Sequence, residues 1–278
     1  MTAGHGGPPP VPIVRRPPDP DDAVIWEPSE RWVRGVKEGV TVVDSRRPLL
    51  VWEPGRPVPL YAFPTGDVRM DLLRRTVRPA SGRHAGSTVF YDLEAGESVV
   101  PAAAWTYPGE ELGGHVSFEW FGRNALDHWY EEEEEVFVHP RDPHKRVDAL
   151  PSTRHVRVEI DGTVVADTHS PVLLFETDLP VRYYVPRVDV RLDLLTPVRM
   201  HTRCPYKGVA GEYWSWPGGG TRRDIAWSYP DPLPAVGVIK DRVAFYNESV
   251  DITVDGERQQ RPVTFFSKPT RRGPAPNR

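Results

Sequence analysis

The stretch RHVRVEIDGTVVADTHSPVLLFE, residues 154–176, decides the fold of this chain. Residues 155–160 alternate between polar and apolar side chains, which is the pattern of a strand with one buried face. The dipeptide Asp161-Gly162 is typical of a tight hairpin turn that leads into a return strand. Residues 172–176 are almost entirely apolar and end on an acid, which predicts a short buried strand. The stretch therefore predicts antiparallel β-structure.

The same pattern occurs earlier in the chain. Residues 31–53 read RWVRGVKEGVTVVDSRRPLLVWE, and nine of their 23 positions are identical to residues 154–176 when the two are aligned without a gap. Further matches follow in the same order, between residues 61–73 and 183–195 and between AWTYP (104–108) and AWSYP (226–230). Unrelated segments would agree at only a few positions, so we interpret the chain as a tandem duplication.

The duplication sets the expected domain limits. We expect a disordered proline-rich arm over residues 1–22, a first domain over 23–139, a linker over 140–151, a second domain over 152–266 and a disordered tail over 267–278. The linker prediction rests on its three prolines and several charges.

Proline content argues against a helical protein. The chain has 32 prolines among 278 residues, about twice the usual ~5%, and proline interrupts helix interiors. Further short strands are expected at 182–185, 209–216, 223–229 and 250–254, with one short helix over 189–195 and a second within 231–246. We therefore expect a mainly β fold: two tandem copies of a compact antiparallel domain, tent-like or barrel-like, with one or two short helices each.

Charge and cysteine content limit the function classes. Lys and Arg total 35 against 39 Asp and Glu, a net charge of −4, so there is no basic excess of the kind that marks a nucleic-acid binder. The single cysteine, Cys204, allows neither an intramolecular disulfide nor a Cys-x-x-Cys zinc site. The chain shows no secretory signal and no apolar run long enough to span a membrane. These features favour a cytoplasmic protein.

One string is specific enough to indicate a family. It is TRCPYKGVAGEYWS, residues 202–215, and it occurs with ADT (166–168), LFE (174–176), YYVP (183–186), DVR (189–191) and AWSYP (226–230). In this order the motifs resemble the bacterial and fungal family known as domain of unknown function 427, and the whole chain looks like its tandem form. The resemblance implies a β-rich unit similar to the tent-like sheets of methionine sulfoxide reductase B and related zinc proteins.

A nucleotidyltransferase activity is sometimes attached to that family. Such chemistry usually needs closely spaced carboxylates for two metal ions and a Gly-Ser loop for the phosphates. No Gly-Ser precedes an Asp-x-Asp in this chain, and there is no phosphate-binding Gly-x-x-x-x-Gly-Lys. Nucleotidyl transfer is therefore the weakest of the alternatives.

Cys204 and Lys207 are the candidate reactive groups. An ammonium beside a thiol favours the thiolate, whereas a free cysteine is more often a small buried apolar residue. Lys207 lies among aromatic residues, where it could lose its proton and act as base or nucleophile, or bind an anion. The structural alternative is a salt bridge to Glu176 or Asp189.

The nearby carboxylates have both functional and structural interpretations. Glu176, at the end of its strand, is either a half-buried general acid or base or a bracket for backbone amides. Asp167 and its counterpart Asp44 are expected in turns, and Asp189 and its counterpart Asp67 at the start of a helix. The run Glu131–Glu135 is expected to be solvated.

Aromatic residues are expected to line a pocket in the second copy. Tyr184, Tyr206, Tyr213 and Trp214 are the candidate ligand-binding residues there, together with Asp189. The first copy has GRHAG (82–86) where the second has CPYKG (204–208), so Arg83 and His84 could supply a cationic pair, or the first copy has lost its site. His201 and Cys204 lack a third ligand, so we predict no metal and no cofactor.

These residues lead to one functional hypothesis and its rivals. We expect a cytoplasmic protein with a small-molecule pocket in the second copy. If it is an enzyme, we expect acid–base or nucleophilic chemistry of Cys204, Lys207 and Glu176 without a metal. A non-catalytic ligand-binding or interaction module that uses the same pocket is the alternative. The sequence does not indicate the oligomeric state.

Overall fold

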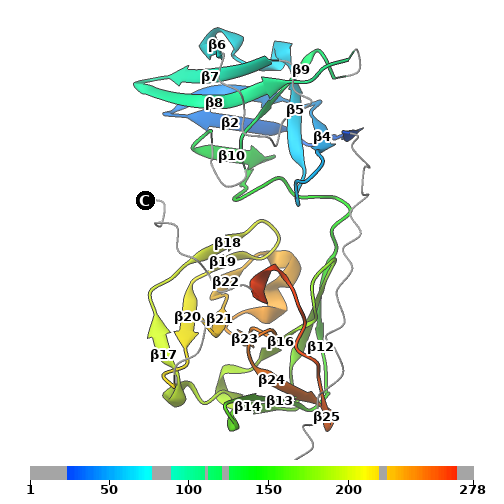
Figure 1. Cartoon of the computed structure of the whole chain (residues 1–278), viewed down its shortest axis with the longest axis vertical. Helices are drawn as coiled ribbons and strands as arrows, with labels where there is room; N and C mark the ends of the chain where they lie inside the picture. The colour runs from blue at the N-terminus through cyan, green and yellow to red at the C-terminus, as the bar shows by residue number, and fades with distance from the viewer. Residues whose placement is uncertain (1–23, 77–88, 110–111, 121–124, 219–223, 268–278) are drawn as a thin grey trace, which may run out of the picture. The chain divides into compact units, whose positions relative to one another are not determined.

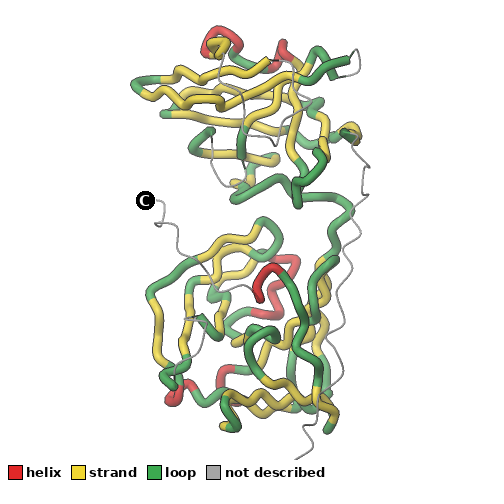
Figure 2. The backbone as a smooth tube through the Cα atoms, viewed as in Figure 1, coloured by secondary structure: helices red, strands yellow, loops and turns green. Residues whose placement is uncertain are grey.

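The computed structural model describes residues 24–76, 89–109, 112–120, 125–218 and 224–267. They form two compact units, which divide between Pro143 and His144. Strands dominate both units, and the helical segments described are short 3₁₀ turns, as Figure 1 and Figure 2 show. The prediction of a mainly β fold is confirmed. The expected arm and residues 268–278 lie outside the described residues, as do Arg83 and His84.

The second unit contains a seven-stranded and a four-stranded antiparallel sheet (Figure 1). The larger sheet has the order β12 (Val147–Pro151), β15 (Val172–Glu176), β16 (Arg182–Val185), β23 (Val243–Phe245), β21 (Ala226–Ser228), β20 (Glu212–Ser215) and β17 (Thr196–Val198). The smaller sheet has the order β14 (Thr163–Thr168), β13 (Val156–Ile160), β24 (Asp251–Val254) and β25 (Glu257–Arg258).

The first unit repeats this topology strand for strand. Its larger sheet has the order β1 (Ile25–Pro28), β4 (Leu49–Trp52), β5 (Leu60–Pro64), β9 (His115–Phe118), β8 (Ser98–Thr106), β7 (Val89–Ala95) and β6 (Leu73–Thr76). Its smaller sheet has the order β11 (Glu134–Glu135), β10 (His128–Glu131), β2 (Val33–Lys37) and β3 (Val40–Ser45). The duplication is therefore confirmed in the fold, and the sheets are open rather than closed into barrels.

The predicted hairpin turn forms in both copies. Asp161 and Gly162 have φ angles of 49° and 76°, and the equivalent Glu38 and Gly39 have φ angles of 47° and 75°. Two successive left-handed residues define the type of turn whose twist matches that of antiparallel strands. The turns join β2 to β3 and β13 to β14, so the register of each hairpin is set locally.

Each face of the larger sheet of the second unit buries its own apolar cluster. Val185 lies in a cluster with Val158 and Ile252 of the smaller sheet. The next residue back, Tyr184, points to the opposite face because side chains alternate along a strand. There it packs with Trp227 and with the 3₁₀ segment η6 (Pro234–Ile239). The second of these clusters contains the candidate site.

A small third sheet carries the most specific sequence motif. It consists of β18 (Thr202–Cys204), β19 (Gly208–Ala210) and β22 (Asp231–Pro232). The strand expected over 209–216 is therefore divided, because β19 and β20 belong to different sheets with Gly211 between them. The corresponding stretch of the first unit lies outside the described residues.

The single short helix expected over 189–195 is not formed. Two 3₁₀ turns, η4 (Arg187–Asp189) and η5 (Leu192–Leu194), flank Val190, which is buried and bridges to Ala166. So short a helix is marginal by itself, and the bridge gives Val190 a partner that a helix would remove. The first unit has the same arrangement, with η1 (Thr65–Asp67) and η2 (Met70–Leu72) on either side of Val68.

The expected linker over 140–151 is partly a strand. Residues Val147–Pro151 form β12, which pairs with β15 in the register Val147 to Glu176 and Pro151 to Val172. The second unit therefore begins before the expected boundary at residue 152.

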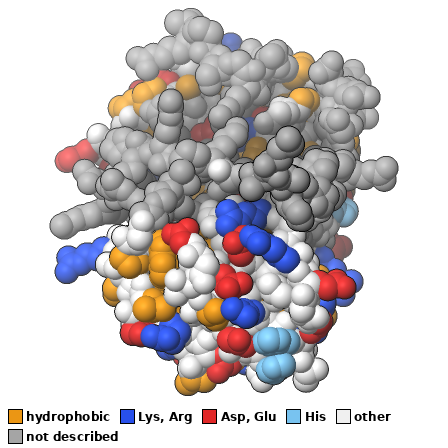
Figure 3. All heavy atoms as spheres, turned by 60° about the horizontal axis from the view of Figure 1, so that its bottom comes forward, with side chains coloured by type: hydrophobic (Ala, Val, Ile, Leu, Met, Phe, Trp, Pro, Cys, Tyr) orange, Lys and Arg blue, Asp and Glu red, His pale blue; other side chains and the backbone are white. Residues whose placement is uncertain are grey.

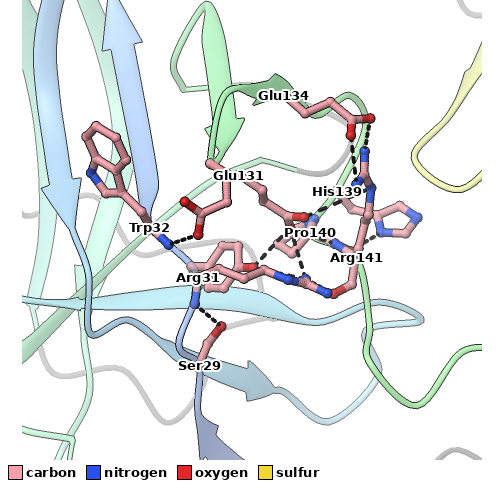
Figure 4. A network of polar contacts seen from close by, with 10 residues as sticks. Ser29, Arg31, Trp32, Glu131, Glu134, His139, Pro140 and Arg141 are labelled. Carbon is pink, nitrogen blue, oxygen red and sulfur yellow. Dashed lines mark hydrogen bonds and ion pairs between the residues drawn. The ribbon is translucent and has the colours of Figure 1, made fainter. Parts of the chain in front are cut away.

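The acidic run Glu131–Glu135 is not uniformly solvated. The Glu131 side chain is only 4% exposed. Its Oε1 accepts hydrogen bonds from the Tyr61 hydroxyl at 3.0 Å, the Arg141 backbone N–H at 3.1 Å and the Arg31 guanidinium at 3.3 Å (Figure 4). This network attaches the segment after β11 to the body of the first unit.

The edges of the two seven-stranded sheets are short strands. Three of these edge strands contain a proline: Pro28 in β1, Pro151 in β12 and Pro197 in β17. The fourth, β6, contains Arg74 and Arg75. In the part of the chain that the structure describes, no helix is long and apolar enough to cross a membrane.

Candidate functional site

A buried ion pair joins the end of β15 to the turn between β18 and β19. The Lys207 ammonium donates a hydrogen bond to Glu176 Oε2, and the two side chains are 11% and 6% exposed. Lys145 Nζ lies 3.7 Å from the other carboxylate oxygen. The carboxylate of Glu176 is thus held between two ammonium groups rather than bracketing backbone amides. The structure forms the Lys207–Glu176 salt bridge that the sequence left as an alternative.

The turn that carries Lys207 is fixed by its backbone. Cys204 pairs with Gly208 across the hairpin, and the Lys207 N–H donates to the Cys204 carbonyl at 3.3 Å. Gly208 has a φ of +93°, and a Cβ there would lie 3.4 Å from Asp231 O and Leu233 N. Because glycine adopts this conformation without strain, it allows the turn to hold Cys204 and Lys207 close together.

The charge state of Lys207 follows from its neighbours. Burial alone would lower the pKa of its ammonium, but the nearby Cys204, Glu176 and Tyr184 groups outweigh burial and hold that pKa above its usual value. Lys207 is therefore a cation at neutral pH. Its role as a base or amine nucleophile is disfavoured, and its role as a positive charge beside Cys204 and Glu176 is favoured.

Two buried tyrosines complete the cluster. Burial raises the pKa of Tyr184 to about 12, against the opposing effect of Lys207, and burial also raises the pKa of Tyr229, with Tyr184 and Cys204 next to it. The Tyr184 oxygen accepts a hydrogen bond from Trp227 Nε1 at 3.3 Å. Among the described residues neither tyrosine hydroxyl donates a hydrogen bond. Both tyrosines are buried, at 0% and 4% exposure.

The first copy keeps part of this cluster in a fully bonded form. Glu53, the counterpart of Glu176, accepts hydrogen bonds from Trp105 Nε1 at 3.1 Å, the Tyr107 hydroxyl at 2.7 Å and Arg56 Nε at 2.8 Å. Arg56 also pairs with Glu119 at 3.0 Å. Here the tyrosine hydroxyl and the carboxylate satisfy each other, so the equivalent position offers less to a ligand.

The structure separates the remaining predicted site residues. Tyr206 is half-buried, and its ring centre lies 6.0 Å from Lys145 Nζ. Tyr213 lies in the same apolar cluster as Tyr184, and its hydroxyl bonds to Thr202 Oγ1. Trp214 lies on the opposite face of the sheet, where the Arg187 guanidinium is 5.4 Å from its ring centre. Trp214 therefore does not belong to the cluster around Lys207.

The two predicted aspartate roles are wrong. Asp189 does not cap a helix: it is the last residue of η4, and its Oδ2 accepts a hydrogen bond from Thr168 Oγ1 at 2.7 Å. Asp167 lies within β14 rather than in a turn and pairs with His155 Nε2 at 2.7 Å. Its counterpart Asp44 similarly lies in β3 and accepts from Trp32 Nε1 at 2.7 Å.

Two residues of the cluster were missed by the sequence prediction. Lys145 lies two residues before β12, and its position follows only from the pairing of Val147 with Glu176. Tyr229 follows β21, and its repetition as Tyr107 was the available signal. Across the described ranges, no three His, Cys, Asp or Glu side chains are grouped so as to hold a metal ion.

Comparison with known protein families gives a match over most of the chain. The model of a family described as "Domain of unknown function (DUF427)" matches the chain twice, over residues 25–132 and 148–256. A search of curated proteins found no match. The two matched segments agree with the two units of the fold.

Proposed function

This chain belongs to the DUF427 family as two tandem copies, and on this basis we propose that its second copy carries a small-molecule site at which Cys204 acts as a nucleophile. The observation that carries the proposal is the buried Lys207–Glu176 ion pair, whose ammonium is also a charge neighbour of Cys204. A fixed cation next to a thiol stabilises the thiolate, which is the reactive form.

The surrounding hydroxyls suggest the kind of reaction. The Cys204 thiol first releases its proton to water, and the thiolate attacks a carbonyl carbon of the small molecule. The carbonyl oxygen gains negative charge and accepts hydrogen bonds from Tyr184 and Tyr229. The bond from the carbonyl carbon to the leaving group then breaks, and the leaving group takes up a proton from water, which leaves a thioester on Cys204. A water molecule hydrolyses the thioester, which releases a carboxylic acid and regenerates the thiol. Lys207 acts throughout as a charge and Glu176 as its positioning partner.

We place this chemistry in the cytoplasm. A single free cysteine fits a reducing compartment, where a thiol stays reduced.

The alkylation rate of Cys204 tests the proposal directly, because it is the only thiol in the chain. At pH 7 we expect iodoacetamide to modify the wild type about tenfold faster than a Lys207→Met variant, because the variant lacks the cation that favours the thiolate. Glu176→Gln leaves the Lys207 charge without its carboxylate and should react at least as fast as the wild type. Mass spectrometry of the modified chain measures all three rates.

A matched control lies in the first copy. Arg56→Met removes the buried cation that pairs with Glu53 and should leave the rate at Cys204 unchanged. If Lys207→Met fails to fold, Lys207→Met/Glu176→Leu removes both charges of the pair and keeps the test available. Equal rates in the wild type and in a folded variant that lacks Lys207 would overturn the reactive-thiol proposal and favour a module that only binds its ligand.

A further inference from the structure

A cleft lies in the first copy. It has a volume of about 360 Å³ and is lined by Trp32, Asp44, Arg46, Arg47 and Asp67. This volume is within the range of small-molecule sites, ~300–1,000 Å³. The cleft is therefore large enough for more than a single ion.

The two carboxylates of the cleft accept hydrogen bonds from residues that line or adjoin it. Asp44 Oδ1 accepts the Trp32 indole N–H at 2.7 Å, and Asp67 Oδ2 accepts the Ser45 hydroxyl at 2.8 Å. Arg47 reaches Asp67 at 3.4 Å and remains 74% exposed. These carboxylates orient the indole and neutralise Arg47 only in part, because hydrogen bonds of 3.4 Å are long.

The equivalent place in the second copy keeps the acids but not the arginines. Asp167 holds His155, and Asp189 accepts from Thr168, in the same geometry as Asp44 and Asp67. The positions of Arg46 and Arg47 are occupied by His169 and Ser170. His169 stacks on His155 with ring centres 4.3 Å apart, and Figure 3 shows pale-blue histidine side chains at the surface.

The cation near the second acid differs between the copies. Arg242 is the charge neighbour of Asp189 and donates to the Ser170 carbonyl at 2.8 Å, whereas the equivalent residue of the first copy is His115. Arg47 is thus the neighbouring positive charge of Asp67, as Arg242 is of Asp189.

Arg46 is different: within the described ranges no acidic side chain pairs with it, and its guanidinium lies 4.8 Å from the Trp32 ring centre.

From this comparison we infer that the cleft binds the carboxylate or phosphate group of a small molecule, with Arg46 as the principal donor and the exposed Arg47 as the second. A guanidinium presents paired N–H groups that match the geometry of both anions. The site is independent of the proposed reaction at Cys204, because it lies in the other unit.

The test follows the Trp32 indole N–H by NMR in the full-length chain labelled with ¹⁵N. Phenyl phosphate, benzoate and inorganic phosphate are titrated separately at constant ionic strength, and the signal is assigned with Trp32→Phe. We expect a saturable shift with at least one of the three. Arg46→His, which installs the residue of the second copy, should weaken binding at least about tenfold because a charge-assisted hydrogen bond is lost, and Arg46→Lys should retain part of it.

Arg69→His is the matched control, because Arg69 is an exposed arginine of the same unit that already pairs with Asp71 at 2.6 Å. It should leave the titration unchanged. The inference is overturned if none of the three probes gives a saturable shift, or if Arg46→His and Arg69→His weaken binding equally. Because no acidic side chain of the described residues pairs with Arg46, its replacement should not unfold the unit.

Discussion

At the scale of single residues, the two copies use the same glutamate in different ways. Glu53 receives three hydrogen bonds from Trp105, Tyr107 and Arg56. Glu176 is instead paired with two lysines. Glu53, which accepts hydrogen bonds from both neutral and cationic donors, is a satisfied part of the core. The two lysines beside Glu176 instead leave the hydroxyl groups of Tyr184 and Tyr229 without an acceptor among the described residues. This difference favours the second copy as the reactive one.

A second buried charge pair gives the second unit a defined acid response. Arg182 donates two hydrogen bonds of 2.7 Å to Glu248, and Leu60 occupies the equivalent of Arg182 in the first copy. Burial would raise the pKa of the Glu248 carboxyl, but Arg182 outweighs it and holds that pKa below its usual value. The free energy of unfolding gained from Glu248 is therefore complete above the unfolded-state pKa of ~4.3 and is lost as the pH falls below it.

We predict that Glu248→Gln lowers the stability of the second unit at pH 7 by about 3 kcal/mol, because it leaves Arg182 buried without its partner. The same variant should lose less stability than the wild type between pH 5 and 3, since the titrating group is gone. Urea unfolding across this pH range measures both effects. Glu94→Gln, which removes an exposed partner of Arg74 in the first unit, is the control, and parallel pH curves for wild type and Glu248→Gln would contradict the prediction.

At the scale of elements, the two copies fill the same space between paired strands with side chains of different size. In the first copy Gly35 of β2 faces Trp129 of β10, and in the second Val158 of β13 faces Ile252 of β24. A Cβ on Gly35 would lie 2.4 Å from Leu126 Cδ1 and 2.9 Å from the Trp129 ring. The glycine therefore makes room for the indole, and the two pairs are alternative ways to fill one space.

Gly35→Val should accordingly destabilise the first unit by at least ~2 kcal/mol through overpacking. Gly35→Val/Trp129→Ile transplants the pair of the second copy and should recover part of that loss. Urea unfolding gives the values, and Gly66→Ala, at a glycine with open space around it, controls for the loss of a glycine. A single variant as stable as the wild type would show that the strands adjust freely.

The elements also show what sequence pattern can and cannot predict. Alternation and the Asp161-Gly162 turn were sufficient for β13 and β14, because both are set by neighbours in the chain. The strand β12 was not predicted, since residues 147–151 carry a mixed pattern and pair with β15, which is distant in sequence. The helix expected over 189–195 was wrong because the bridge from Val190 to Ala166 is a tertiary contact that periodicity does not contain.

At the scale of the whole molecule, the repeat unit is the strand set from β1 to β11 or from β12 to β25. Each set has its own apolar clusters, so each should fold as a unit. We predict that a fragment of residues 144–278 unfolds cooperatively, whereas one of residues 152–278, which starts at the boundary expected from sequence, is at least ~2 kcal/mol less stable because β15 loses one of its two partner strands.

Urea unfolding of the two fragments checks this prediction. Lys145→Ala in the longer fragment separates the loss of that cation from the loss of the strand. Equal stability of the two fragments would mean that β12 contributes nothing to the second unit.

The candidate site was predictable only to the extent that it repeats or carries a motif. Cys204, Lys207 and Glu176 stood out in the sequence, and the structure brings them together with Tyr184. Trp214 was misplaced because adjacent residues of one strand face opposite sides of a sheet, so Tyr213 and Trp214 cannot both line one pocket. Lys145 could not be predicted as a site residue, because its position depends on how β12 pairs with β15.

The edge strands of the two large sheets have a consequence for crowding inside a cell. A free sheet edge can recruit a strand from another molecule through its unpaired backbone N–H and C=O groups, which is how aggregates and fibres begin. Here those edges are three to five residues long and carry Pro28, Pro151 or Pro197, or the paired charges of Arg74 and Arg75. Proline has no N–H to offer, and guanidinium groups repel a like edge. Two open sheets on one chain double the number of exposed edges, and these residues keep neighbouring molecules from joining them.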